Sequence, residues 1–98
     1  MNAIDISIKA SELIFTGELT RNTISPSFEK KSAQLITNEQ NVFNLAAVSK
    51  IDTAGLAWLL LMLEQAGKRA IKLKFIHIPD ELTKLAKLSA VDSFLPVE

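Results

Sequence analysis

The apolar run from Ala54 to Leu63 constrains the fold of this 98-residue chain more than any other segment. It is about half as long as the roughly 20 apolar residues that a helix needs to cross a bilayer, so it predicts a buried or docking helix and not a membrane span. Such a helix needs other elements to cover it. Because 48% of the residues are hydrophobic, the chain can form one core, and residues 1–98 are expected to be a single domain.

The residues before this run predict a β-hairpin followed by a helix. Residues 4–9 alternate isoleucine with polar side chains, the period of a strand with one buried face. Residues 13–17 are rich in β-formers and predict the returning strand. Ser25-Pro26 has the form of an N-cap followed by proline at the first helical position, so a helix is expected from there to about Thr37.

Later segments alternate between strands and helices. Residues 42–46 predict a central strand covered on both faces. A helix is expected over residues 52–69 and a strand over 72–77. Residues 79–81 open a short helix whose apolar positions are expected to face inward: Leu82, Leu85, Ala86 and Leu88. A further short turn or edge segment is expected within residues 91–97. The order β-β-α-β-α-β-α predicts an α/β fold, a mixed β-sheet with helices packed on it.

The composition argues against several classes of function. Eleven Lys and Arg residues balance eleven Asp and Glu residues, so the chain has no general attraction to nucleic acid or an acidic membrane surface. Cysteine is absent, and His77 is the only histidine, so it is expected to be structural or on the surface. The three glycines lie too far apart for a phosphate-binding loop. We therefore expect no catalytic residues, no metal and no cofactor.

A basic cluster and the first residues bear on binding and location. Lys68, Arg69, Lys72 and Lys74 are interpreted as a solvated helix end, in preference to a phosphate-binding patch. Residues 1–5 lack the pattern of a secretory signal, and the absence of cysteine suits a reducing compartment. A cytoplasmic location is expected.

The helix over residues 52–69 has two faces of different character. At 100° per residue, one arc is expected to face the sheet: Leu56, Leu59, Leu60, Leu63, Ala66, Gly67 and Ala70. The first two turns of the opposite side are apolar as well, and they lie on the side of Thr53: Ala54, Ala57, Trp58 and Leu61. We therefore expect Trp58 to be at least partly exposed.

An exposed tryptophan within an apolar patch has the composition of a protein interface. We predict a partner-binding surface made of Asp52, Thr53, Ala54, Ala57, Trp58 and Leu61. Two plainer explanations stay open: a neighbouring segment could cover Trp58, and Asp52-Thr53 could simply cap the helix. An unoccupied patch also predicts a weak homodimer of the isolated domain, formed about a two-fold axis.

The same residues carry a resemblance to a known family. Residues 43–45, 48–49 and 51–56 resemble the strand, loop and Asp-Ser/Thr-x-Gly-Leu turn of STAS domains, and the order of elements fits that fold over nearly the whole chain. The resemblance implies a non-catalytic module that docks onto a protein partner. In kinase-regulated members the hydroxyl residue after the aspartate is the phosphoacceptor, a role that maps onto Thr53.

Within the family, the chain is most similar to the STAS subunits of the maintenance-of-lipid-asymmetry (Mla) ABC transporters. That likeness rests on Asp52-Thr53, residues 55–57, residues 83–88 and Leu95-Pro96. It implies a cytoplasmic subunit, peripheral at the inner membrane, that binds the transporter's ATPase and supports phospholipid trafficking.

The alternative function is an anti-sigma factor antagonist regulated by phosphorylation at Thr53. Asn44 stands where many members have aspartate, which is expected to remove a negative charge near Thr53 and to argue against kinase control. Nucleotide-binding or enzymatic activity has no constellation of residues behind it.

Overall fold

The computed structural model describes residues 3–95 and confirms the expected order of elements. The elements are β1 (Ile4–Lys9), β2 (Glu12–Leu19), α1 (Pro26–Leu35), β3 (Val42–Ile51), α2 (Thr53–Lys68), β4 (Lys74–Ile76), α3 (Asp80–Leu88) and a 3-10 turn, η1 (Asp92–Phe94). The short turn expected near the end is η1. Residues 96 and 97 of that segment, with Pro96 of the resemblance, lie outside the described residues.

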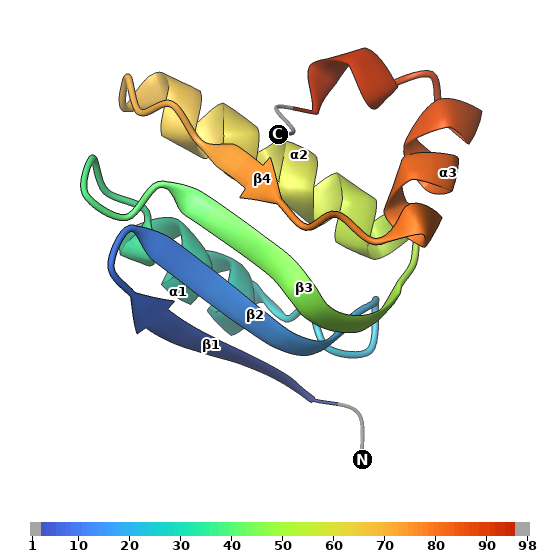
Figure 1. Ribbon diagram of the computed structural model, residues 1–98, viewed down its shortest axis with the longest axis horizontal. Coiled ribbons are helices and arrows are strands. Elements are labelled where there is room, and N and C mark those ends of the chain that lie inside the picture. Colours follow the sequence, from blue (N-terminus) through green and yellow to red (C-terminus); the bar gives the residue numbers. More distant parts are fainter. Residues whose placement is uncertain (1–2, 96–98) are drawn as a thin grey trace.

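The four strands form one mixed sheet, as predicted, and their order in the sheet is β1-β2-β3-β4 (Figure 1). β1 and β2 are the antiparallel hairpin, and Lys9 pairs with Glu12 beside its turn. β3 pairs in parallel with both β2 and β4. The right-handed crossovers usual for parallel strands need a helix between them, and α1 and α2 occupy those positions in the chain.

The predicted cap of α1 is present. The Ser25 side-chain oxygen accepts a hydrogen bond from the Phe28 backbone N–H at 3.1 Å, and Pro26 is the first helical residue. The helix ends at Leu35, earlier than expected, because Ile36 is already extended (ψ 121°) and buries its side chain in the core.

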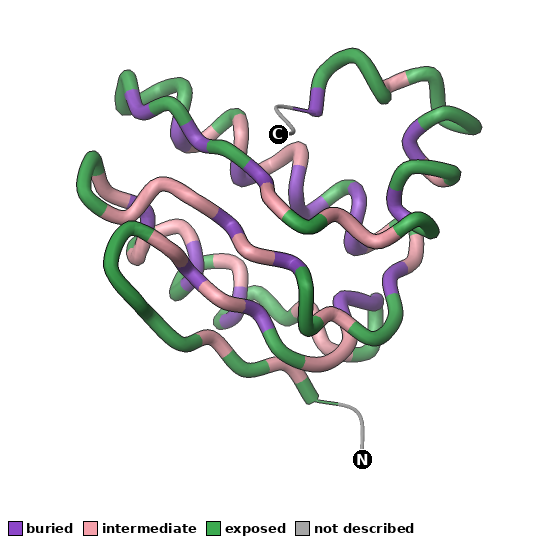
Figure 2. The backbone as a smooth tube through the Cα atoms, in the orientation of Figure 1, coloured by how far each residue is buried: buried purple, intermediate pink, exposed green. Residues whose placement is uncertain are grey.

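Helices α1 and α2 cover one face of the sheet only. The covered face carries side chains that are fully or almost fully buried: Leu13, Phe15, Phe43, Leu45 and Phe75. The expectation that residues 42–46 are covered on both faces is wrong. Val42 and Asn44 are half-buried and Ala46 is exposed, and in Figure 1 α1 and α2 lie behind the sheet while its other face is open. Burial along the strands alternates accordingly (Figure 2).

Trp58 is the centre of the core, so its predicted exposure is wrong. Its side chain is 1% exposed. The indole stacks on Phe43 with ring centroids 5.5 Å apart and meets Phe15 edge-on at 5.2 Å. It also contacts Phe28 of α1, again at 5.2 Å. The indole N–H donates to the buried Ser32 hydroxyl at 3.2 Å, so its polar atom is satisfied inside the core.

With Trp58 in the core, α2 is rotated about its own axis relative to the orientation expected from the sequence. The buried residues of α2 are Gly55, Leu56, Trp58, Leu59, Met62 and Ala66. Of the arc expected to face the sheet, Leu56, Leu59 and Ala66 are buried, Leu60 and Leu63 are half-buried, and Gly67 and Ala70 are exposed. The centre of the buried face is therefore the line of Trp58, Met62 and Ala66.

Helix α3 departs from expectation at one position. Leu82 and Ala86 are buried and Leu85 is half-buried, as predicted, but Leu88 is 86% exposed. Leu88 is the last residue of the helix, and the chain turns at Ser89 and Ala90, so no element within residues 3–95 covers it.

We predict that Trp58→Ala destabilises the domain by about 3–5 kcal/mol, because it empties the centre of the aromatic cluster. The matched change Leu88→Ala should stay within about 0.5 kcal/mol, because that leucine is exposed. Urea denaturation followed by circular dichroism measures both. Equal costs for the two variants would contradict the core described here.

Candidate functional site

The start of α2 is held in place by Asp52. Its carboxylate accepts a hydrogen bond from the Gly55 backbone N–H at 3.1 Å, which makes it the N-cap of the helix. The other carboxylate oxygen accepts from the Arg21 backbone N–H at 3.1 Å. The Asp52 backbone N–H donates to the Leu19 carbonyl at 3.3 Å. One residue thus joins α2 to the end of β2 and to the loop that follows it.

Gly55 allows this close approach. A Cβ atom at this position would overlap the backbone carbonyl oxygen of Leu19 and would press against the Ile51 side chain. Only a residue without a Cβ lets the first turn of α2 pack directly on the ends of β2 and β3. The Asp-Thr-Ala-Gly-Leu segment therefore combines a cap with a close backbone contact.

Thr53 is the first residue of α2 and is exposed. Within residues 3–95 its side-chain hydroxyl makes no hydrogen bond, because Asp52 performs the capping. The simple cap explanation therefore applies to Asp52 and not to Thr53. The hydroxyl faces solvent at the positive end of the helix dipole.

Five of the six predicted partner-binding residues are exposed or half-buried: Asp52 caps α2, and Thr53, Ala54, Ala57 and Leu61 lie on the helix. Ala54 and Leu61 are half-buried, Ala57 is exposed, and Asp52 is half-buried by its capping bonds. Trp58 points the other way, into the core. We call Asp52, Thr53, Ala54, Ala57 and Leu61 the α2 surface.

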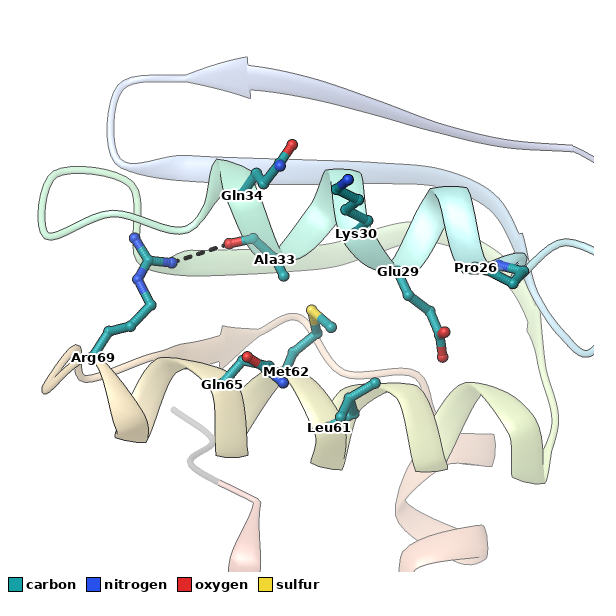
Figure 3. A pocket seen from close by; sticks show the side chains of 9 residues that line it. All are labelled: Pro26, Glu29, Lys30, Ala33, Gln34, Leu61, Met62, Gln65 and Arg69. Carbon is teal, nitrogen blue, oxygen red and sulfur yellow. Dashed lines mark hydrogen bonds between the residues drawn. The ribbon is translucent and has the colours of Figure 1, made fainter.

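A groove of about 630 Å³ between α1 and α2 adjoins this surface. Leu61 and Met62 lie on the α2 side and Ala33 on the α1 side, and Figure 3 shows the Glu29 side chain extending across the groove toward Leu61. The far end is closed by Arg69, whose guanidinium donates to the Ala33 carbonyl at 3.1 Å. Leu61 thus belongs both to the α2 surface and to the groove.

The exposure of two apolar side chains outside α2 was not predicted. Leu88 of α3 is 86% exposed and Phe94 of η1 is 67% exposed. Helix α3 packs against α2 and lies beside its first turns (Figure 1). No signal in the sequence separates Phe94 from a core aromatic residue, and the helical spacing of Leu88 favoured burial.

Asn44 does not lie where the resemblance suggested. It is the third residue of β3, whereas Thr53 follows the far end of that strand. The Asn44 side chain lies on the open face of the sheet and donates to Glu12 at 2.9 Å. The expectation of a lost charge near Thr53 is therefore wrong, and Asn44 gives no argument against kinase control.

The remaining candidate residues lie on the surface. His77 is exposed and follows β4, and residues 3–95 contain no cluster of three or more His, Cys, Asp and Glu side chains that could hold a metal ion. The basic residues Lys68, Arg69, Lys72 and Lys74 are all exposed, and Lys68 pairs with Glu64 at 3.8 Å. No helix in the described part of the chain is long and apolar enough to span a membrane.

The division of roles between Asp52 and Thr53 gives a stability prediction. Asp52→Ala should cost about 1–2 kcal/mol, because it leaves the amides of Gly55 and Arg21 without a carboxylate partner. Thr53→Ala should change stability by less than about 0.5 kcal/mol. Thermal melts of the two variants test this, and a larger loss for Thr53→Ala would show that the threonine is the cap.

Comparison with known families agrees with this geometry. Residues 2–96 match the family model described as "Mlab, STAS domain". A search of curated proteins gave no significant match. The match covers almost the whole chain, and the mixed sheet, the order of elements and the Asp-Thr-Ala-Gly-Leu start of α2 are those expected of that family. The chain belongs to the STAS-domain family.

Proposed function

We propose that this chain is a non-catalytic STAS subunit that binds and supports the ATPase of an ABC transporter for phospholipid trafficking. STAS domains commonly mediate protein–protein interactions, and the description of the matching family carries the Mla name. In this proposal the chain is cytoplasmic and is held at the inner membrane by its partner.

The observation that carries the proposal is the state of Thr53. It is exposed at the first position of α2, and its hydroxyl has no partner within residues 3–95. Asp52 and Gly55 hold this position firmly against β2, so the threonine is presented on a rigid element. A fixed, unpaired polar group beside small apolar side chains is suited to contact a protein partner.

The apolar part of the contact differs from the one expected from the sequence. Because Trp58 is in the core, Ala57 and Leu61 supply the apolar area on α2. In this proposal the partner also contacts the exposed Leu88 of α3 and Phe94 of η1. An aromatic anchor near the centre of an interface often dominates binding, and Phe94 takes that role in our proposal.

The second candidate is an anti-sigma factor antagonist switched by phosphorylation at Thr53. It is favoured by the same exposed hydroxyl, which a kinase could reach without unfolding the helix. A phosphate there would lie at the helix N-terminus, where negative charge is favourable.

Identification of the partner separates the two candidates. The tagged chain is purified from its native cells and the bound proteins are identified by mass spectrometry. An ABC ATPase supports the first candidate, and an anti-sigma serine kinase supports the second. Phe94→Ala should reduce the amount of either partner, whereas Thr16→Ala on the open sheet face should not.

We predict that Thr53→Glu folds normally but binds the partner at least about tenfold more weakly. The new carboxylate stabilises the helix start by a few tenths to about 1 kcal/mol. When the partner binds, however, the carboxylate beside Ala57 would lose its hydration, which weakens binding. Thermal melts and isothermal titration with the purified partner measure the two effects.

Thr16→Glu is the matched control, because Thr16 is also exposed but lies on the open face of the sheet. It should keep the affinity of the unmodified chain. Wild-type affinity in Thr53→Glu would remove Thr53 from the interface.

A further inference from the structure

Strand β1 is an open edge of the sheet. It pairs with β2 on one side, and its other side has no neighbouring strand among residues 3–95 (Figure 1). Two of the devices that usually protect an edge are absent from β1: it contains no proline, and its six residues pair with β2 in an unbroken register without a bulge. Ile8 of this strand is 47% exposed.

The direction of the backbone groups follows from one hydrogen bond. The Glu18 backbone N–H donates to the Ala3 carbonyl at 3.1 Å, so the backbone groups at Ala3 point toward β2. In an antiparallel pair this direction alternates along the strand, so Asp5, Ser7 and Lys9 also point toward β2. The N–H and C=O groups of Ile4, Ile6 and Ile8 therefore point out of the open edge.

We propose that a second copy of this chain pairs with β1, antiparallel and about a two-fold axis at Ser7. In this arrangement Ser7 lies opposite Ser7 of the other copy. Asp5 of each copy lies opposite Lys9 of the other copy, so this pair occurs twice. Ile6 faces Ile8, so the exposed Ile8 side chain gains an apolar neighbour. The outward backbone groups of Ile6 and Ile8 then form the hydrogen bonds of a continuous eight-stranded sheet.

The pattern of charges selects both the occupant and the register. If the pairing register between the two copies of β1 shifted by one residue, isoleucine side chains would lie on the polar face of the sheet. The register can therefore differ only by steps of two residues. With the axis at Ile6, Asp5 would face Ser7 and Lys9 would face Ala3. Only the axis at Ser7 pairs Asp5 with Lys9, and opposite charges across strands are favourable. A sequence that complements itself in this way fits a second copy better than an unrelated strand.

This contact leaves the α2 surface free. β1 and β4 are the two edges of the sheet, and α2 connects β3 to β4 at the far side from β1. A dimer formed through β1 would therefore carry two α2 surfaces. Because a single strand makes the contact, we expect a weak dimer that dissociates on dilution.

A cysteine at position 7 tests the two-fold axis. The chain contains no cysteine, so Ser7→Cys introduces a single exposed thiol. Directly opposed residues in a non-hydrogen-bonded pair have Cα atoms about 4.5 Å apart, which a disulfide can span. With oxidised glutathione, Ser7→Cys should become a covalent dimer. Thr16→Cys, exposed on the same face but on β2, should stay monomeric.

Charge exchange tests the register without a covalent bond. Sedimentation equilibrium at low salt should show that Asp5→Lys alone and Lys9→Asp alone weaken the dimer by about tenfold or more, because each places like charges opposite one another twice. The double variant Asp5→Lys/Lys9→Asp should restore the affinity of the wild type. Leu61→Asp, on the α2 surface, should leave it unchanged.

Three outcomes would overturn the proposal. The first is a wild-type chain that stays monomeric at about millimolar concentration, which is far above the dissociation constants usual for specific complexes. The second is a dimer that the single charge reversals do not weaken, or that the double variant does not restore. The third is a dimer abolished by Leu61→Asp, which would place the contact on the α2 surface.

Discussion

The fold depends on the packing of one indole ring between three elements. Trp58 of α2 stacks on Phe43 of β3, meets Phe28 of α1, and donates its N–H to Ser32, also of α1. Ser32 in turn donates to the Phe28 carbonyl at 2.6 Å, so its hydroxyl is satisfied as donor and acceptor. This polar contact within an aromatic cluster fixes how far α2 is rotated about its axis. That rotation determines which side of α2 is left for a partner.

The elements of the fold could be predicted because each has a local cause. The alternation in β1, the Ser25-Pro26 start of α1 and the Asp52 start of α2 are all readable from neighbouring residues. The rotation of α2 could not be predicted, because its first turns are apolar on every side and a helical wheel then has no clear core face. The deciding partner, Ser32, lies 26 residues away on another helix. The exposure of Leu88 likewise depends on where the chain turns after α3.

Only the local features of the candidate site could be predicted from the sequence. Asp52 and Thr53 were identified because a cap and the residue after it are local features. Their separate roles could be assigned only from the structure. Asp52 accepts hydrogen bonds from the amides of both Gly55 and Arg21, and the Thr53 hydroxyl has no hydrogen bond to any residue that the structure describes. In both candidate functions this hydroxyl is the controlling group. A docking subunit would use it as a neutral contact, and a phosphorylation switch would convert it to a charge beside the Asp52 carboxylate.

Docking of a partner on the start of α2 can be tested by hydrogen–deuterium exchange of the chain with and without the ABC ATPase that we propose as its partner. We expect the partner to slow exchange at the exposed side of the first two turns of α2 and in residues 85–95, while the amides of β1 and β2 keep their rates. Protection confined to the open face of the sheet, with unchanged exchange at residues 53–61, would rule out docking at the start of α2.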